Sequence, residues 1–244
     1  MSGKVWLVGA GPGDPELLTL KAAKVLQGAE VVLLDDLVNS QLLEHCPRAR
    51  VLRVGKRGGC RSTPQDFIHR LMLRYARQGR RVVRLKGGDP CIFGRGGEEA
   101  EWLGARGIEC ELVNGITAGL AAASQCGIPL TLRGISRGVS LVTAHTQDDS
   151  VPNWPALAQG GTTLVVYMGV ARLADIRDGL LAGGMRANMP VAMIENASLP
   201  QQRECRSNLS RMLADATAFH LSSPAVLIIG DVATRAEQAL ARSA

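Results

Sequence analysis

The sequence is poor in aromatic residues and contains no long apolar run. Aromatic side chains make up 3% of its 244 residues, which is poor material for the stacking surfaces that bind single-stranded nucleic acid. No stretch reaches the roughly 18 consecutive apolar residues that a membrane-spanning helix needs. The opening residues MSGKVWLVGAGPG also lack the apolar region and cleavage site of a signal peptide. We therefore expect a cytoplasmic protein with no nucleic-acid partner and no membrane contact.

Paired cysteines and metal-ligand spacings are missing as well. The six cysteines are scattered along the chain without a C-x-x-C pair, so neither a zinc site nor a disulfide framework is predicted. The four histidines do not show the i, i+4 spacing of the H-E-x-x-H motif. The sequence accordingly predicts reduced thiols in the core or in loops, and no metal centre.

Acidic residues are nearly missing from one long segment. Between Arg48 and Lys86 thirteen cations accompany a single acid, Asp66. Residues 1–114 carry a net charge of +5, whereas residues 115–244 carry +1. Some of these cations recur at helical spacing and belong to a solvated helix face, but a basic surface also favours an anionic partner. A small polyanion is the partner that we expect.

What the chain does contain is a regular alternation of strand and helix signals. Strands are predicted at 4–11, 30–35, 49–55, 81–88, 108–113, 138–145, 162–169, 189–197 and 223–231. Helices are predicted at 14–29, 63–79, 96–107, 170–184, 208–220 and 234–243, and another starts within the small-residue segment 114–131. Asp14 and Thr63 are predicted N-caps, each followed by a proline in the first helical turn. The alternation predicts mostly parallel sheets with covering helices, in two α/β domains, 1–114 and 115–244.

The turn GAGPGD, from Gly9 to Asp14, follows the first strand. It is similar to the dinucleotide fingerprint G-x-G-x-x-G, but its glycines stand at alternate positions and Asp14 takes the place of the third one. Pro12 stiffens the turn and removes a main-chain N–H that a pyrophosphate would need. A tight strand-to-helix turn with a purely geometric task is the alternative reading.

A second glycine-rich transition, VRLKGGDPCIFGRGGEE, follows the strand at 81–88. Ligands of open α/β sheets bind beyond the carboxyl ends of the strands, and glycines there let the main chain approach a bulky ligand. The segments GITAG at 115–119, YMG at 167–169 and ENAS at 195–198 are further candidates of this kind. Together these loops predict a binding site built from several strand ends.

These segments resemble the uroporphyrinogen-III C-methyltransferases, in order and over nearly the whole chain. The block GGDPCIFGRGGEE is the most specific of them, whereas the first glycine turn is much less so. The resemblance implies two α/β domains of the tetrapyrrole methyltransferase type with the active site in the cleft between them. It also implies a homodimer that uses S-adenosyl-L-methionine to methylate uroporphyrinogen III at C2 and C7. The product would be precorrin-2, for sirohaem, cobalamin or haem d1 biosynthesis.

The resemblance also implies which residues contact the cofactor and move protons. The cofactor contacts are Pro12, Gly87, Gly88, Asp89, Ile92, Thr117, Ala118, Met168 and Ala197. Relatives often have glycine at position 197, but a contact through the main chain tolerates the additional methyl group. Asp35, at the end of the second strand, and Lys56 match positions with proton-transfer roles. Asp36 is a departure, because some relatives have arginine there.

Arginines are the expected clamps for a substrate rich in carboxylates, because their planar guanidinium binds a carboxylate through two hydrogen bonds. The candidates are Arg61, Arg95, Arg133 and Arg137. Arg95 and Glu98 lie in the most specific block and are predicted to act at the catalytic centre. In the alternative reading, Arg95 braces its own loop by pairing with Glu98 or Glu99, and Lys56 is one member of a solvated basic face.

Three other functions compete with this interpretation. A methyltransferase of the same fold could act on a later corrin precursor or on RNA. The turn GAGPGD with Asp35 could instead belong to a nicotinamide-dependent oxidoreductase. Some related bifunctional enzymes carry a dehydrogenase–ferrochelatase module ahead of the methyltransferase, and we expect none here because the first strand starts at Lys4. A basic binding module would leave the glycine loops without a purpose.

Overall fold

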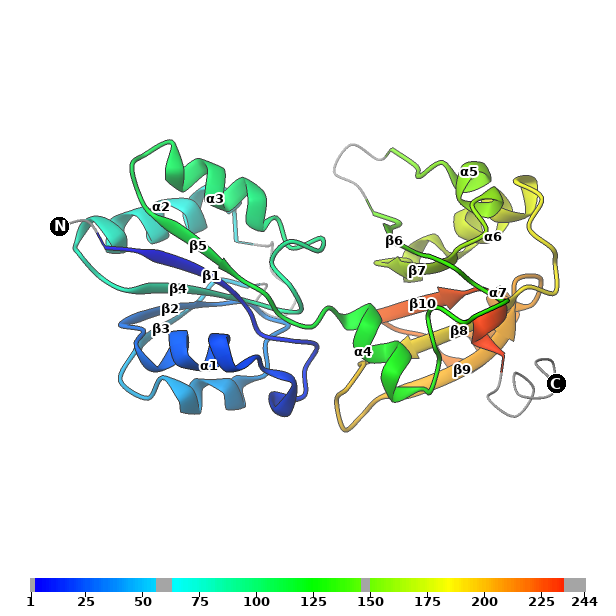
Figure 1. The fold of residues 1–244 in the computed structure, drawn as a ribbon, viewed down its shortest axis with the longest axis horizontal. Coiled ribbons are helices and arrows are strands. Elements are labelled where there is room, and N and C mark those ends of the chain that lie inside the picture. Colours follow the sequence, from blue (N-terminus) through cyan, green and yellow to red (C-terminus); the bar gives the residue numbers. More distant parts are fainter. Residues whose placement is uncertain (1–2, 56–62, 146–149, 235–244) are drawn as a thin grey trace. The chain divides into compact units, whose positions relative to one another are not determined.

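The computed structural model describes residues 3–55, 63–145 and 150–234, which belong to two units (Figure 1). The first unit is Met1–Thr117 and the second is Ala118–Ala244. The sequence places the domain boundary slightly earlier, between residues 114 and 115. The helix predicted at 234–243 falls, apart from its first residue, outside the described part of the chain.

The first unit contains a five-stranded sheet in which all paired strands are parallel. Its strands are β1 (Val5–Gly9), β2 (Val31–Leu34), β3 (Arg50–Arg53), β4 (Val82–Lys86) and β5 (Cys110–Val113). Their order is β3-β2-β4-β1-β5. A parallel sheet with both faces covered is built from continuous apolar strands, and the fully buried VVLL of β2 is such a strand. The carboxyl ends of all five strands therefore lie along one edge.

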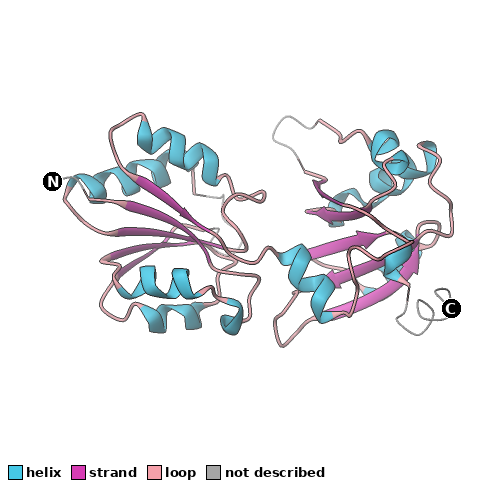
Figure 2. Cartoon of the chain, in the orientation of Figure 1, coloured by secondary structure: helices cyan, strands magenta, loops and turns pink. Residues whose placement is uncertain are grey.

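Helices cover both faces of this sheet (Figure 2). They are η1 (Pro15–Leu17), α1 (Leu20–Gln27), η2 (Ser40–His45), α2 (Gln65–Arg77) and α3 (Gly96–Gly104). Helices α1 and η2 pack on one face, in a cluster that contains Leu26 and Val32. Helices α2 and α3 pack on the other, in a cluster that contains Met72 and Leu33. Adjacent strand residues point to opposite faces, so Val32 and Leu33 belong to different clusters.

Two helix starts differ from the prediction. Asp14 does cap a turn, accepting a hydrogen bond from the Glu16 main-chain N–H at 2.9 Å, but that turn is the short η1. The following backbone is extended, and α1 begins only after Thr19, whose hydroxyl caps it. Thr63 does not cap α2; its hydroxyl donates instead to the Gly55 carbonyl oxygen at 3.3 Å.

The second unit contains a mixed sheet, which corrects the prediction of mostly parallel strands for this half. Its strands are β6 (Val139–Thr143), β7 (Thr163–Tyr167), β8 (Pro190–Glu195), β9 (Arg203–Asn208) and β10 (Ala225–Ile229). Their order is β6-β7-β10-β8-β9, and only β6 and β7 pair in parallel. Strand β9, with the polar sequence RECRSN, was not predicted. Because it lies at the sheet edge, it needs no apolar run.

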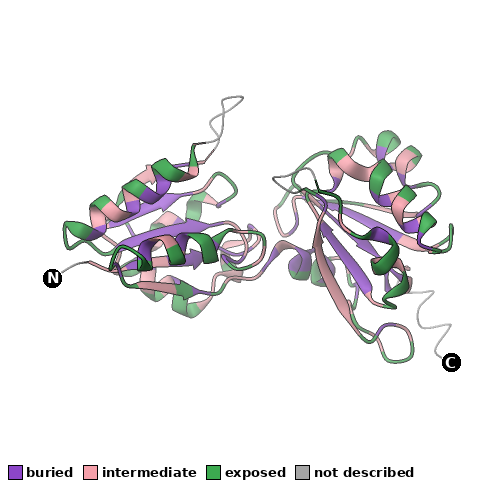
Figure 3. Cartoon of the chain, turned by 90° about the horizontal axis from the view of Figure 1, so that it is seen from above, coloured by how far each residue is buried: buried purple, intermediate pink, exposed green. Residues whose placement is uncertain are grey.

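Helices also cover both faces of the second sheet. They are α4 (Ala118–Gln125), α5 (Trp154–Gln159), η3 (Val170–Arg172), α6 (Leu173–Ala182), α7 (Met212–Phe219) and η4 (Asp231–Ala233). Helix α4 packs on the face that includes Val165, whereas α5, α6 and α7 pack on the face that includes Val166. Figure 3 shows buried central strands and exposed outer helix faces in each unit. In the described ranges, no helix combines the length and apolar character that crossing a membrane requires.

Candidate active site

The loops after β4, β1 and β5 meet main chain against main chain at the carboxyl edge of the first sheet. Gly11 and Gly88 exchange two hydrogen bonds, with N···O distances of 3.2 and 2.7 Å. A Cβ atom on Gly115 would lie 2.2 Å from the Gly88 carbonyl oxygen, and one on Gly9 would lie 2.5 Å from the Gly115 nitrogen. No side chain fits at either position without moving backbone. We call Gly9, Gly11, Gly88 and Gly115 the glycine junction.

The Asp89 carboxylate holds the glycine junction together through hydrogen bonds. Its side chain is buried. One carboxylate oxygen, Oδ1, accepts from the Cys91 main-chain N–H at 2.7 Å, and the other, Oδ2, accepts from the Gly115 N–H at 3.0 Å. The Asn114 side-chain amide lies 3.4 Å from the same Oδ2. The carboxylate therefore ties the loop after β4 to the loop after β5.

Apolar side chains line the accessible part of this edge. A Cβ atom on Gly87 would lie 3.0 Å from the Cβ atom of Leu37, which follows β2 and is exposed. Phe93, in the loop after β4, is also exposed and has a left-handed backbone with φ of 53°. Ile92 is half-buried in the turn that its N–H closes onto the Asp89 carbonyl oxygen at 3.2 Å. Pro12 directly follows the junction residue Gly11.

Arg95 pairs with Glu98, as in the alternative that the sequence left open. Arg95 Nε and Nη2 lie 3.0 and 2.6 Å from the same oxygen, Oε2, of Glu98. This ion pair raises the pKa of Arg95 and lowers the pKa of Glu98. Arg95 has a left-handed backbone with φ of 60° at the start of α3. Both side chains are exposed, so the pair remains accessible to an anion.

Asp35, immediately after β2, is joined to a group of buried charges. Its Oδ2 accepts a hydrogen bond from Nη2 of Arg84 at 3.1 Å. Arg84 stands on the central strand β4 and is buried, as are Lys86 and Glu99. Lys86 Nζ lies 3.1 Å and Arg84 Nε 3.6 Å from Oε1 of Glu99. Burial, together with the charge of Arg84, lowers the pKa of Lys86 despite this pairing.

Two residues of α2 complete this group. Gln65 donates its side-chain N–H to Oε1 of Glu99 at 2.8 Å and lies 3.1 Å from Nε2 of His69. Burial lowers the pKa of His69, whose ring stacks on Trp102 at a centroid distance of 4.8 Å. The sequence interpretation missed this cluster, because it assigned the cations of β4 to a basic surface. The alternation Val82, Arg84, Lys86 on one face of a central strand was the available signal.

The second unit places its own predicted residues at one edge of the mixed sheet. Strands β7 and β8 both pair antiparallel with β10, and Val226 of β10 faces Tyr167 as well as Ile194. The residues that follow these strands, Met168 and Ala197, therefore lie at the same edge. Met168 is exposed and has φ of 54°. Ala197 is buried between Asn196 and Ser198, whose φ values are 49° and 65°.

The segment that joins the units carries the last two predicted cofactor contacts. Thr117 is a buried residue of the first unit, and Ala118 is the first residue of α4. In the next position, the Gly119 N–H donates to the Tyr167 hydroxyl at 2.9 Å. A Cβ atom at Gly119 would lie 2.4 Å from that hydroxyl oxygen. This glycine therefore lets α4 start against the end of β7.

Of the predicted substrate arginines, Arg95 lies in the loop after β4, whereas Arg133 and Arg137 come from another segment. Arg133 and Arg137 are exposed in the connection between α4 and β6. Arg137 precedes β6, which runs parallel to β7, so it lies at the edge where β7 begins. Met168 lies at the far end of β7, about five residues or roughly 16 Å of strand away. Lys56 and Arg61 lie outside the described residues.

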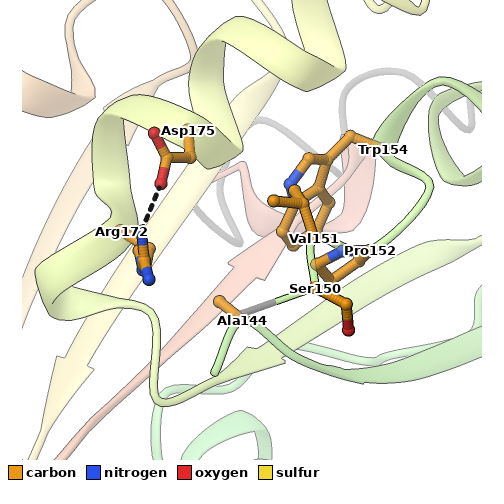
Figure 4. Close-up of a pocket in the computed structure, with 7 residues that line it drawn as sticks. All are labelled: Ala144, Ser150, Val151, Pro152, Trp154, Arg172 and Asp175. Atoms are coloured by element: carbon orange, nitrogen blue, oxygen red, sulfur yellow. Dashed lines mark hydrogen bonds and ion pairs between the residues drawn. The ribbon is translucent and has the colours of Figure 1, made fainter. Parts of the chain in front are cut away.

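A small hollow in the second unit does not involve any predicted site residue (Figure 4). It is lined by Ala144, Ser150, Val151, Pro152, Trp154, Arg172 and Asp175. Arg172 Nη1 lies 3.4 Å from Asp175 Oδ2. The Trp154 ring is buried against α6, where a Cβ atom on Gly179 would lie 2.5 Å from its Cδ1 atom. The close approach of Trp154 to Gly179 indicates packing of α5 on α6.

Comparisons with known proteins show which family this chain belongs to. The family model of tetrapyrrole (corrin/porphyrin) methylases matches residues 4–213. The chain is 76% identical over 232 residues to a uroporphyrinogen-III C-methyltransferase of Pseudomonas aeruginosa, covering 95% of each protein. It is 45% identical to a siroheme synthase of Acinetobacter baylyi, of which it spans 52%.

A solved structure shows the same likeness in three dimensions. This crystal structure is of a uroporphyrin-III C-methyltransferase from Thermus thermophilus complexed with S-adenyl homocysteine. It matches with a TM-score of 0.82 and 42% identity, covering 94% of this chain and 98% of that one. A cobalt precorrin-4 methyltransferase matches with a TM-score of 0.84 and 28% identity, covering 95% and 96%. The resemblance drawn from the sequence motifs is confirmed by these matches.

Proposed function

Because the chain belongs to the tetrapyrrole (corrin/porphyrin) methylase family, it is a methyltransferase, and we propose that it methylates uroporphyrinogen III with S-adenosyl-L-methionine. The glycine junction carries this proposal. It provides a main-chain surface without side chains at the carboxyl ends of β4, β1 and β5, where α/β sheets bind their ligands. The similar Thermus structure complexed with S-adenyl homocysteine supports the choice of cofactor.

The chemistry of the described residues supports such a cofactor. Leu37 and Phe93 offer exposed apolar surface to a flat ring or a thioether, and glycine main chain offers hydrogen bonds without steric hindrance. We propose Pro12, Gly87, Gly88, Asp89, Ile92, Thr117, Ala118, Met168 and Ala197 as its contacts. Asp89 already uses both carboxylate oxygens within the loops, so we assign it the shaping of the cofactor surface.

When bound, S-adenosyl-L-methionine supplies an electrophilic methyl group on a sulfonium. Transfer of that methyl group to a pyrrole carbon would form a carbon–carbon bond while the methyl–sulfur bond breaks and S-adenosyl-L-homocysteine leaves, and the pyrrole N–H would then have to lose its proton. We assign the proton transfer to Asp35 and Lys56, and general acid–base catalysis of this kind typically contributes roughly 10²–10⁴-fold. Arg95 and Glu98 act at the same centre: Arg95 exchanges its contact with Glu98 for a substrate carboxylate, and this orients the ring. Orientation and exclusion of water can supply roughly 7–11 kcal/mol of the barrier reduction.

The positions of methylation, the oligomeric state and the pathway are proposed from the resemblance to the same relatives. We propose methylation at C2 and C7, through precorrin-1 to precorrin-2, by a cytoplasmic homodimer. The product would serve sirohaem, cobalamin or haem d1 biosynthesis, and the match to half of a siroheme synthase favours the first of these. Arg61, Arg133 and Arg137 remain proposed substrate contacts, with Arg137 the weakest because of its place at the opposite sheet edge.

Mass spectrometry of the product tests this function. The enzyme is incubated with uroporphyrinogen III and S-adenosyl-L-methionine that carries a deuterated methyl group. We expect the product to gain two labelled methyl groups, with a transient species that carries one. A final product with one or three labelled groups would contradict the assignment, and an unlabelled product would refute the activity. Binding calorimetry with NAD provides the control against an oxidoreductase, for which NAD would bind and S-adenosylhomocysteine would not.

A further inference from the structure

Arg84, Lys86 and Glu99 form a buried ion cluster next to Asp35. Neutralising Glu99 alone would not require both cations of this cluster. Glu99 is fully buried and its Oε1 receives Lys86 at 3.1 Å and Gln65 at 2.8 Å. Those two partners already satisfy that oxygen. Arg84 lies beside the same carboxylate and also contacts a second one: its Nε is 3.6 Å from Glu99, and its Nη2 is 3.1 Å from Asp35. Its guanidinium thus spans two carboxylates, one fully buried and one at the solvent edge.

The planar guanidinium makes this connection rigid. Arg84 is 3% exposed, and its Nη1 also lies 3.5 Å from the Leu33 carbonyl oxygen of the neighbouring strand β2. Nη2 and Nη1 are held by Asp35 and by the Leu33 carbonyl oxygen, and Nε lies at ion-pair distance from Glu99 without a hydrogen bond of its own. Because the side chain is also buried, the group has little freedom to rotate. The Asp35 side chain is 34% exposed, and apart from Arg84 its carboxylate receives the Asp36 main-chain N–H at 3.1 Å. Among the described residues, Arg84 is therefore the buried charged group that fixes one oxygen of Asp35.

We propose that Arg84 is a positioning residue of the methyl transfer: anchored by Glu99, it holds the Asp35 carboxylate at the orientation in which Asp35 accepts the substrate proton. This inference rests on the proposed proton-transfer role of Asp35. Arg84 does not touch the substrate. It acts through Asp35 alone, and misplacement of a catalytic group by about 1 Å can cost roughly 10²-fold in rate.

Arg84→Met is the informative substitution. It removes the contact to Asp35 but leaves the Lys86–Glu99 pair intact, so no buried charge is left without a counterion. Lys86→Met is the matched control, because it removes a buried cation that contacts Glu99 and leaves the Arg84–Asp35 contact in place. The turnover of uroporphyrinogen III is measured for wild type, Arg84→Met, Lys86→Met, Asp35→Asn and the double variant Arg84→Met/Asp35→Asn.

We expect Arg84→Met to lower kcat by about 10- to 100-fold, with an unchanged Kd for S-adenosylhomocysteine and a cooperative melting curve. In the double variant, the Arg84 substitution should cost no further activity beyond that of Asp35→Asn. A scaffold role would instead give multiplicative losses, because the two changes would act independently. Multiplicative losses, or an equal loss in Lys86→Met, would overturn the proposal.

The cycle also separates this inference from the function on which it rests. If Asp35→Asn keeps the wild-type kcat, the proton-transfer role of Asp35 is wrong, and the positioning role is wrong with it. If Asp35→Asn is slow and Arg84→Met is not, only the positioning role is refuted. Should Arg84→Met fail to fold, Arg84→Lys takes its place in the cycle. A lysine keeps the charge but cannot span both carboxylates, so a smaller loss with the same absence of additivity is expected.

Discussion

In the part of the chain that the structure describes, each unit buries one glutamate, and the two are neutralised in different ways. Glu99 of the first unit is 0% exposed and faces two cations that are themselves buried, Arg84 and Lys86. Glu195 of the second unit is 1% exposed, but its partner Arg203 has 47% of its side chain in solvent. In the first cluster both cations are buried and Asp35 is a partly exposed carboxylate, whereas the second opens to water through Arg203.

The contacts of Glu195 indicate a purely structural task. It accepts from the Ser222 main-chain N–H and from Nε of Arg203, the latter at 2.8 Å. Arg203 in turn donates to the carbonyl oxygens of Phe219 and His220, both at 3.3 Å. Burial raises the pKa of Glu195, but the hydrogen bonds from Ser222 and Arg203 outweigh it, so the pKa is lowered overall. This cluster closes the end of α7 against β8 and β9. Glu195 opens the candidate segment 195–198, but its carboxylate is turned to Ser222 and Arg203.

The largest expected effect follows from removing Glu99. Glu99→Ala leaves Arg84 and Lys86 buried with only Asp35 as a counterion, and loss of one partner from a buried ion cluster typically costs about 3–5 kcal/mol. Urea denaturation should show this as a reduced free energy of unfolding. The double variant Glu99→Leu/Lys86→Met removes both charges and should recover most of the loss. If the double variant is no more stable than Glu99→Ala, uncompensated charge is not the cause.

Removing Glu195 should cost less. In Glu195→Ala the guanidinium of Arg203 can be hydrated where it stands, so the main penalty is the unpaired Ser222 N–H, about 1–3 kcal/mol. The same urea titration, run beside Glu99→Ala, measures the difference between the clusters. Turnover of uroporphyrinogen III by the folded Glu195→Ala enzyme should equal that of wild type. Equal destabilisation in the two variants would remove the distinction between a cluster whose cations are buried and one that opens to water.

The smallest effect is expected at Glu111, a half-buried glutamate near the surface, which serves as the reference for the two buried ones. Glu111 contacts Lys21 at 2.7 Å and Lys4 at 2.8 Å, and these hydrogen bonds lower its pKa to about 2. A lowered pKa in the folded state means that the stabilisation is complete above the unfolded value of 4.5 and disappears as the pH falls through about 2. Surface pairs of this kind contribute about 0–1 kcal/mol.

Thermal melting of wild type and Glu111→Gln at a series of pH values tests this assignment. The wild type should melt slightly higher at pH 7, and the difference should vanish near pH 2. Added salt should also reduce the difference, because exposed charges are screened. A difference in melting temperature that persists unchanged at the acid end would show that Glu111 acts by packing and not by charge.

The contrast between the units also marks what the sequence could reveal. The first sheet was predictable, because apolar strands such as VVLL alternate with amphipathic helices. The antiparallel strands of the second unit were not, because strand direction depends on which neighbours pair, and β9 carries no apolar pattern. The start of α1 was misplaced because two capping residues, Asp14 and Thr19, compete within six positions.

The candidate site likewise contains one part that the sequence predicted and one part that it did not. Glycines at several strand ends predict a ligand-binding surface from the sequence alone, because few other structural roles require so many glycines at these positions. The buried ion cluster does not, because Arg84 and Lys86 look like surface residues until α2 and α3 cover β4. The sequence left two roles open for Arg95 for a related reason. Its i, i+3 spacing to Glu98 indicated that the two could pair, but the sequence did not indicate that both side chains are exposed.

The central claim is that the glycine junction is where the methyl donor binds, and binding calorimetry with S-adenosylhomocysteine tests it most directly. Gly115→Ala is compared with Gly97→Ala, since a Cβ atom at Gly97 meets nothing within 4 Å whereas one at Gly115 lies 2.2 Å from the Gly88 oxygen. We predict that Gly97→Ala binds as wild type does, and that a folded Gly115→Ala binds at least about tenfold more weakly, a difference of roughly 1.4 kcal/mol. Equal Kd values for the two variants would contradict the claim.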